Sequence, residues 1–501
     1  MFKNPLYQKS FKKLNYYFEE NKILKRLFDH QYENEDYIKD IAHTKRLLER
    51  YTTDPDFKKE LDNGNYDIIK KYNIDINPED VRFHWDNSYH LECIKNKTEF
   101  TPQVKKYLGW IMEKLAHRDR IREIDAVPEN EKFRIWRERQ NNRMIHVFGI
   151  AKSIGIVHPP FSMELSKGCS GNCWFCGFGA EEKEGDYLYT DKNKKEYREV
   201  LHVLKDVMGN AAATGFLYSA TDPLDNPDYE QFLIDYAVIL GYAPQITTSL
   251  ATRDIERTRR LIWLNHKLGS DVDRFSMLSV GVLNKLHENF TAEELLYVEL
   301  IPQNIESNSM IANAGRAADN KKQMEKKATS AGVTNYIHDN NDGDSISCMS
   351  GFDINMFDKS VRLVTPAKSN KKWPYGFWIY ESAKFKDAQE LKNIMNSMIN
   401  KYMLEALEED SIIAFLKGFE LEIDKDCISL STNNSKIEVD YGEVLPGLKE
   451  IAGIISKDNH TAKQIVDIMK EKHNQKESDT WDTLNLLFQD GLLDEEPGFF
   501  F

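Results

Sequence analysis

Residues 161–177 decide the fold, and they read Phe161-Ser162-Met163-Glu164-Leu165-Ser166-Lys167-Gly168-Cys169-Ser170-Gly171-Asn172-Cys173-Trp174-Phe175-Cys176-Gly177. A short apolar run leads directly into three cysteines with C-x3-C-x2-C spacing. Three thiolates on one tight loop can hold three irons of a [4Fe–4S] cluster and leave the fourth iron open to a small molecule. The stretch therefore predicts a strand followed by an iron–sulfur loop.

A structural zinc ion is the alternative for this loop. Such zinc sites take four protein ligands, and no fourth cysteine lies nearby. His158, upstream of the strand, is the local side chain of a suitable type. Iron–sulfur binding by Cys169, Cys173 and Cys176 is therefore favoured.

The overall composition argues against several classes of protein. The chain has 501 residues, which predicts about three domains. Its net charge of −14 and the lack of a sustained basic stripe argue against nucleic-acid binding. No apolar window of about 18 residues and no apolar N-terminal segment occur, so we expect no membrane span and a cytoplasmic location. Six cysteines are too few for a disulfide scaffold.

Alternating strand-like and helix-like segments follow the apolar run. Such alternation is typical of α/β proteins with a parallel sheet, and five or six units within about 200 residues predict a partial (β/α)6 barrel. The expected strands of the barrel and of a β-rich extension over 346–381 are Phe161–Leu165, Phe216–Ala220, Gln245–Ser249, Phe275–Val280, Val298–Ile301, Val361–Val364 and Phe377–Tyr380.

Helical patterns flank this barrel on both sides. Thr101, followed by a proline, predicts the start of a long N-terminal helix. Near the C-terminus, a hairpin with Asn433 and Asn434 at its turn precedes a helix with a Thr461–Gln464 capping box, and two strands with three helices are winged-helix-like. We therefore expect an N-terminal helical domain (1–154), a barrel with its extension (155–385), and a linker helix with a winged-helix-like module (386–501).

The other three cysteines, Cys93, Cys348 and Cys427, lie far apart in the sequence. A second cluster needs about four cysteines or close to it, so we expect none. Cys93 and Cys427 are typical of buried core residues. Cys348 follows the last barrel unit, where the opening of a barrel would be covered, and a thiol readily donates a hydrogen atom to a carbon radical. Position alone leaves Cys348 open between a hydrogen donor and a buried side chain.

The cysteine loop and its surroundings resemble the radical S-adenosylmethionine (SAM) superfamily over about 155–345. In that superfamily the same spacing follows the first strand of a partial barrel, with an aromatic residue, here Phe175, before the third cysteine. The resemblance implies that SAM binds the open iron and is cleaved to a 5′-deoxyadenosyl radical, which abstracts a hydrogen from the substrate.

One element departs from that superfamily. Its usual Gly-Gly-Glu motif is replaced by Ser219-Ala220-Thr221-Asp222-Pro223. Asp222 is our candidate for contacting the SAM ammonium, and Thr248, Ser276 and Ser279 are candidates for ribose or carboxylate contacts. Each of these three hydroxyls is equally well explained as an ordinary residue at a strand end.

Longer stretches are similar to the radical SAM peptide epimerases of proteusin-type natural-product pathways. They are residues 164–177, 221–229, 348–352 and 373–376. The resemblance implies an enzyme that converts L-residues to D-residues in a ribosomally made peptide. In that family the radical removes the Cα hydrogen and a cysteine thiol returns one from the opposite face. Cys348 matches the donor position.

Two kinds of partner follow from this resemblance. The C-terminal module resembles recognition elements that bind the leader of a precursor peptide by adding a strand to a hairpin. The hairpin edge near Ile437–Tyr441 is the expected docking face, and a structural cap without a partner is the alternative. The second expected partner is an electron donor such as flavodoxin or ferredoxin.

Two other functions stay open. A radical SAM enzyme that forms thioether or carbon–carbon crosslinks removes two electrons from its substrate, and such enzymes usually carry additional cluster cysteines. A catalytically silent peptide-binding protein with a structural metal is the other. A cobalamin-dependent methylase is disfavoured because the N-terminal region has a helical pattern rather than a βα pattern.

Overall fold

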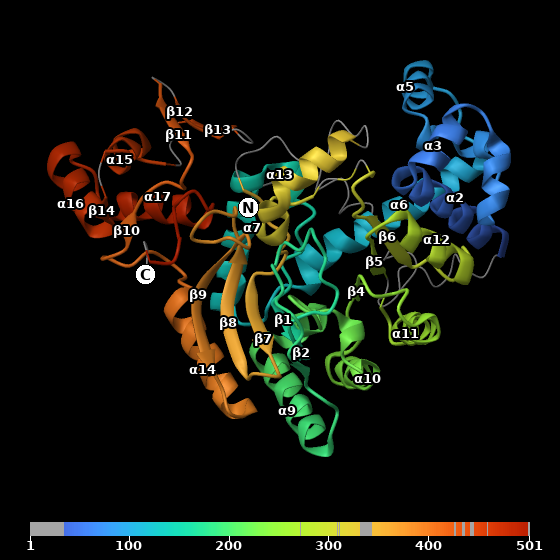
Figure 1. The fold of residues 1–501 in the computed structure, drawn as a ribbon. Helices are drawn as coiled ribbons and strands as arrows, with labels where there is room; N and C mark the ends of the chain where they lie inside the picture. Colours follow the sequence, from blue (N-terminus) through green and yellow to red (C-terminus); the bar gives the residue numbers. More distant parts are fainter. Residues whose placement is uncertain are drawn as a thin grey trace.

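The protein is a mixed α/β structure, with the N-terminal helices and the C-terminal module at opposite ends and the strands between them (Figure 1). Among the residues described, no helix is long and apolar enough to cross a membrane. The computed structural model describes residues 35–270, 272–307, 309, 311–330, 343–424, 427–432, 436–440, 445–457 and 459–498.

Helices form the N-terminal region, as expected from the sequence. The Thr101 hydroxyl caps α6 by accepting a hydrogen bond from the Val104 N–H at 3.2 Å. Asn130 caps α7 in the same way. The α-helices of this region are α2 (Glu35–Thr53), α3 (Pro55–Asp62), α4 (Arg82–Trp85), α5 (Asn87–Asn96), α6 (Pro102–Arg120), α7 (Glu131–Phe148) and α8 (Ile150–Ser153).

Two sheets carry the strands of the central region. In the first, β1 runs parallel to β7, and β8 and β9 follow antiparallel. In the second, β4, β5 and β6 are parallel. The strands are β1 (Phe161–Glu164), β4 (Thr247–Thr248), β5 (Asp273–Met277), β6 (Val298–Pro302), β7 (Gly351–Asn355), β8 (Ser360–Pro366) and β9 (Phe377–Lys384), with β2 (Ser166–Lys167) and β3 (Gly185–Asp186) as a separate short pair.

Helices cover one face of the four-stranded sheet. Phe161 and Met163 of β1 pack into a large apolar core with side chains from α9, α10 and α14. Because side chains alternate along a strand, Ser162 and Glu164 face the opposite side. The helices of the central region are α9 (Asp191–Met208), α10 (Tyr229–Leu240), α11 (Ile255–Lys267), α12 (Val280–Asn289), α13 (Gly315–Ser330) and α14 (Ala388–Tyr402).

The expected continuous (β/α)6 arc is not what the described residues form. The expected strand Phe216–Ala220 makes only one bridge, between Phe216 and Ser162 of β1. The Ala220 N–H donates to the Glu164 carboxylate instead of to a neighbouring strand, and Pro223 then has no N–H to offer. The strands therefore stay in two sheets without a closed barrel.

Other strand boundaries also differ from those expected. The strand over Gln245–Ser249 shortens to β4. The strand expected to run to Val280 ends at Met277 as β5, because the Ser279 hydroxyl already caps α12. An additional strand, β7, precedes the expected strand at Val361. Its pairing with β1 was not predicted from the sequence.

The C-terminal module has its own apolar core. The expected hairpin is present as β12 and β13, and a further strand, β11, pairs with β12. The Thr461–Gln464 capping box is confirmed, whereas Asn433 and Asn434 lie outside the described residues. The elements are β10 (Ile412–Ile413), β11 (Glu420–Ile423), β12 (Cys427–Ser431), β13 (Lys436–Asp440), α15 (Leu448–Ile455), β14 (His460–Thr461), α16 (Ala462–His473) and α17 (Glu477–Gln489).

Candidate functional site

The cysteine loop begins where β1 ends. β2 and β3 pair at its base, and the Cys169 N–H donates to the Glu181 carbonyl at 2.9 Å. Gly168 has a φ of +73°, and a Cβ at this position would lie 2.1 Å from the Glu182 carbonyl oxygen. Only glycine fits there, so the chain can turn sharply just before the first cysteine.

The three cysteine side chains of the loop are half-buried. The Gly171 N–H donates to Cys169 Sγ at 3.3 Å, and the Ala180 N–H donates to Cys176 Sγ at 3.5 Å. A Cβ on Gly171 would lie 3.3 Å from Cys169 Sγ and 3.6 Å from Cys173 Sγ, so these two sulfurs flank the glycine. Hydrogen bonds to sulfur of this kind tune iron–sulfur clusters.

The chemistry of this loop fits an iron–sulfur cluster. Thiolates are soft ligands suited to such clusters. Within the described residues, no group of three or more His, Cys, Asp or Glu side chains is placed to hold a single metal ion. His158, the candidate fourth zinc ligand, instead makes a 2.7 Å hydrogen bond through Nδ1 with Ser350 Oγ. Cys169, Cys173 and Cys176 stay the predicted cluster ligands.

Burial favours the protonated form of two of these thiols. It raises the pKa of Cys169 to about 12 and also raises the pKa of Cys173. The carboxylates of Asp222 and Asp225 add to the rise in the pKa of Cys169. Because a bound metal replaces the proton on a ligating thiol, we expect cluster binding to release protons.

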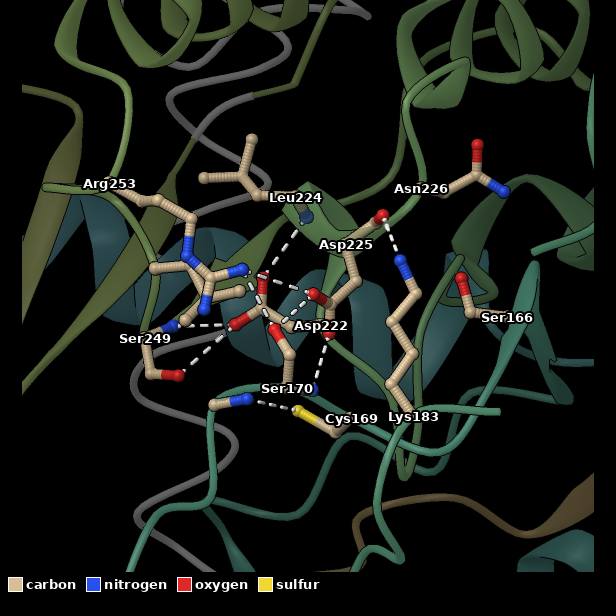
Figure 2. Close-up of polar contacts among 12 residues, drawn as sticks. Ser166, Cys169, Ser170, Lys183, Asp222, Leu224, Asp225, Asn226, Ser249 and Arg253 are labelled. Carbon is tan, nitrogen blue, oxygen red and sulfur yellow. Dashed lines mark hydrogen bonds and ion pairs between the residues drawn. The ribbon is translucent and has the colours of Figure 1, made fainter. Parts of the chain in front are cut away.

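Asp222 uses both of its carboxylate oxygens within the protein (Figure 2). Oδ1 accepts hydrogen bonds from the Leu224 N–H at 3.0 Å and the Thr248 hydroxyl at 2.7 Å. Oδ2 accepts hydrogen bonds from the N–H of Ser249 at 2.8 Å and from its hydroxyl at 3.2 Å. A carboxylate has about four lone-pair sites, so a SAM ammonium would have to displace one of these donors. The contact between Asp222 and SAM stays a prediction.

Asp225 ties the cysteine loop to the same turn (Figure 2). Its carboxylate accepts hydrogen bonds from the Ser170 N–H at 2.8 Å and from the Ser170 hydroxyl, and Arg253 lies 3.4 Å away. Lys183 donates to the Asp225 carbonyl at 2.7 Å. The turn that stands in place of Gly-Gly-Glu therefore positions the loop, a role that sequence reasoning did not assign.

The other candidate SAM contacts differ in exposure. Thr248 is buried, and Ser276 is half-buried on β5. Ser279 is exposed and its hydroxyl accepts an N–H from the first turn of α12 at 3.2 Å. Phe175 is half-buried and packs edge-on against Trp174, with ring centroids 5.6 Å apart.

Arg316, on the first turn of α13, was missed from the sequence. Its backbone N–H donates to the Cys176 carbonyl at 2.9 Å, and its Nη1 donates to the Cys173 carbonyl at 2.9 Å. Nη2 donates to the Ala180 carbonyl. Nothing in the local sequence marks this arginine, because its partners lie more than a hundred residues earlier. It holds three carbonyls of the cysteine loop at once.

Cys348 lies on a segment that runs from the cysteine loop to the start of β7. Near one end, the Ile346 side chain packs against Gly177, where a Cβ would come within 2.7 Å of it. Around the cysteine, the His158 N–H donates to the Cys348 carbonyl at 2.9 Å, while the imidazole of the same residue bonds Ser350. Cys348 is thus held from both sides.

The Cys348 side chain is half-buried. Burial raises its pKa to about 11, although the Arg274 guanidinium opposes the rise. The Cys348 thiol in turn adds to the raised pKa of Tyr218, whose hydroxyl forms a 2.7 Å hydrogen bond with Thr247. At neutral pH this cysteine therefore carries its proton.

A polar network on β1, β7 and β8 was also missed. Glu164 accepts hydrogen bonds from the Ala220 N–H at 2.6 Å and from Asn355 Nδ2 at 2.8 Å. Asp353 pairs with Arg362 at 2.7 Å. Burial, and then the charge of Asp353, raises the pKa of Glu164 to about 7. The signal available in the sequence was a glutamate inside an otherwise apolar strand.

The two scattered cysteines differ in their surroundings. Cys93 is buried against Phe83 and Val104, as expected for a core residue. Cys427 lies on β12 and is half-buried, so it is more exposed than expected.

Comparison with known families and structures gives little about activity. No family model matches the chain. The solved structure of BtrN in complex with AdoMet and 2-DOIA is 15% identical, aligned over 29% of this chain and 56% of that one, with a TM-score of 0.23. The chain thus covers little more than half of that structure, and a TM-score this low carries no argument about fold or function.

One relative matches over most of its length. It is the uncharacterized protein y4wI of Sinorhizobium fredii, which is 32% identical over 431 residues, equal to 85% of this chain and 82% of the relative. The match is longer than any one of the three regions, namely the N-terminal helices, the central region with the cysteine loop and the C-terminal module. It therefore extends over more than one of them. The chain belongs to the same protein family as this Sinorhizobium protein.

Proposed function

We propose that this protein is a radical SAM enzyme that converts L-residues to D-residues in a ribosomally made precursor peptide. The observation that supports the proposal is the contact between the segment of Cys348 and the three-cysteine loop. The segment of Cys348 packs on that loop through Ile346 and is anchored by His158. When bound, a [4Fe–4S] cluster with SAM would supply a 5′-deoxyadenosyl radical that removes a Cα hydrogen.

Cys348 would then return a hydrogen atom to the substrate. The S–H bond breaks, a Cα–H bond forms, and a thiyl radical is left on the cysteine. Restoring the thiol takes one electron and one proton, and we assign the electron to a donor such as flavodoxin or ferredoxin. The raised pKa of Cys348 supports this role, because only a protonated thiol carries the hydrogen atom.

The C-terminal module would bind the leader of the precursor peptide. Within the described part of the chain, β13 pairs with β12 along one edge and with no strand along the other. An open edge of this kind can accept an added peptide strand. The Lys436–Glu438 ion pair on β13 is exposed, and such a surface pair contributes little to stability.

The test compares Cys348→Ala with Cys93→Ala, which replaces a cysteine of the N-terminal helices that belongs neither to the cysteine loop nor to the C-terminal module. The substrate is the peptide encoded beside this protein, and the reaction runs anaerobically in heavy water. The native enzyme and Cys93→Ala should give D-residues that carry one deuterium at Cα. Cys348→Ala should still form deoxyadenosine. Its D-product should fall by about 100-fold or more if loss of the donor raises the barrier by about 3 kcal/mol.

Other outcomes would contradict the proposal. Native yields of D-product from Cys348→Ala would assign the hydrogen to another residue. Loss of deoxyadenosine as well would indicate a structural role for Cys348. A product lighter by two hydrogens would favour the crosslinking enzyme instead.

A further inference from the structure

A cavity of about 370 Å³ opens beside the cysteine loop. Gly168 and residues 178–181 of the loop form one side of it, and the C-terminal end of β1 forms another. An occupant would therefore lie next to the loop that we assign to the cluster.

Aromatic side chains form one wall of the cavity. Tyr375 stacks on Phe377 at an interplanar angle of 27°, and Phe178 lies 6.2 Å from Phe377 between ring centroids. Met349 packs into the same apolar cluster as Phe178 and Phe377. Met349 follows Cys348 directly in the sequence, so the aromatic wall packs against the segment that carries the proposed hydrogen donor.

The floor of the cavity is polar, and three of its charged side chains bond within the protein, while Lys167, Glu181 and Asp358 also line the cavity. Arg362 donates to Asp353 through Nε at 2.8 Å and Nη2 at 2.7 Å, and Glu164 accepts two hydrogen bonds. Among the residues described, no hydrogen bond to Arg362 Nη1 is seen. The free Nη1 can donate to a neutral carbonyl oxygen.

We propose that this cavity binds an apolar or aromatic side chain of the peptide substrate, next to the residue that reacts. The aromatic wall receives the side chain, and Arg362 donates to a backbone carbonyl of the same segment. The inference rests on the proposed function, and it names the class of substrate that the site selects.

The experiment measures binding of short capped peptides by ligand-observed NMR. The peptides differ only at a central residue, which is Leu, Phe, Asp or Lys in a glycine background. They are added to the holoenzyme without SAM or reductant. Ser382→Trp places a bulky side chain in the cavity from an exposed position of β9, opposite Arg362 in the strand register. Lys386→Trp is the matched control, because it adds the same side chain at an exposed position that does not line the cavity.

The Leu and Phe peptides should bind more tightly than the Asp and Lys peptides. Ser382→Trp should weaken their binding by about tenfold or more, in the range that hydrophobic pockets discriminate, and Lys386→Trp should not. Tyr375→Ala should weaken the Phe peptide most. Circular dichroism checks that each variant is folded.

Three results would overturn the inference. The first is unchanged peptide binding by folded Ser382→Trp, and the second is a preference for the Asp or Lys peptide. The third is a Ser382→Trp variant that loses SAM binding but keeps peptide binding, which would assign the cavity to SAM. These measurements need no SAM cleavage. Peptide binding in the cavity of an enzyme that never forms deoxyadenosine would refute the proposed function alone. Formation of D-product with no binding effect of Ser382→Trp would refute the cavity assignment alone.

Discussion

Cys348 is the residue whose environment matters most for the proposed chemistry. Burial holds its thiol in the protonated form, with a pKa of about 11, whereas a free cysteine titrates near about 8.5. Iodoacetamide reacts with thiolates. In the folded protein, its rate with Cys348 should rise about tenfold per pH unit from neutral pH to about pH 10.

The measurement is peptide-resolved mass spectrometry of alkylated Cys348 as a function of pH. The same cysteine in urea-unfolded protein is the control, and its rate should level off near the ordinary thiol pKa. A folded-state rate that already levels off at pH 8 would show that Cys348 is ionised more easily than its burial indicates.

Glu164 is the second residue with an unusual titration. Its pKa rises from 4.5 to about 7 on folding, chiefly through burial. The folded protein then holds a proton that the unfolded chain releases, so the contribution of Glu164 to stability is present below pH 4.5 and is lost as pH rises through about 7. The stability of Glu164→Gln relative to the native protein should therefore increase from pH 5 to pH 8, by on the order of 2 kcal/mol.

Thermal unfolding at the two pH values measures this difference. Glu182→Gln, at an exposed position of the cysteine loop, reports the effect of an amide alone. A difference between Glu164→Gln and the native protein that stays constant with pH would contradict the raised pKa.

At the scale of elements, the turn over 221–229 connects the cysteine loop with β4. Asp222 binds Thr248 and Ser249, while Asp225 binds Ser170 of the loop. Both carboxylates are buried. Removal of such an acceptor leaves buried donors unpaired, which costs about 1–3 kcal/mol for each group.

Asp225→Ala should loosen the cysteine loop while the rest of the fold persists. We expect a loss of about 1–3 kcal/mol in stability and a lower iron content after anaerobic reconstitution. Asp254→Ala is the control, because Asp254 caps α11 and contacts the Arg257 N–H rather than the loop. Iron and sulfide analysis with circular dichroism checks both variants. A full cluster in Asp225→Ala would show that the loop holds its shape without this carboxylate.

At the scale of the whole molecule, α7 joins the central region with the C-terminal module. Trp136 belongs to the apolar core of the four-stranded sheet, whereas Arg139 forms a 3.0 Å ion pair with Glu495, and both side chains are fully buried. Arg143 donates to the Pro366 carbonyl at the end of β8 at 2.6 Å. A helix assigned to the N-terminal domain thus packs against both other regions, and the expected domain boundaries stay a prediction.

The Arg139–Glu495 pair should couple the stability of the two regions. Breaking a buried pair leaves one charge uncompensated, so Arg139→Met should cost about 3–5 kcal/mol. The double variant Arg139→Met/Glu495→Leu should lose less stability than the single variant, because neither charge of the pair is left without its partner. Chemical unfolding of all three proteins measures the difference. Equal losses in the single and double variants would mean that the arginine stabilises the protein by packing alone.

Local sequence was enough for the features that depend on near neighbours. The Thr101 cap, the Thr461–Gln464 capping box and the cysteine loop after the strand at Phe161 all lie where the sequence predicts them. The hydrogen bonds of the two helix caps join residues a few positions apart, so spacing along the chain specifies them.

Tertiary structure decided which distant groups meet. β1 pairs with β7, nearly two hundred residues later, rather than continuing through the segment at Phe216, although strands close in sequence usually lie side by side. Arg316 reaches the cysteine loop across 143 residues. Such contacts depend on how packed elements meet, and no local periodicity records that. The arrangement of Glu164, Asp353 and Arg362 around a cavity follows for the same reason from the pairing of three strands.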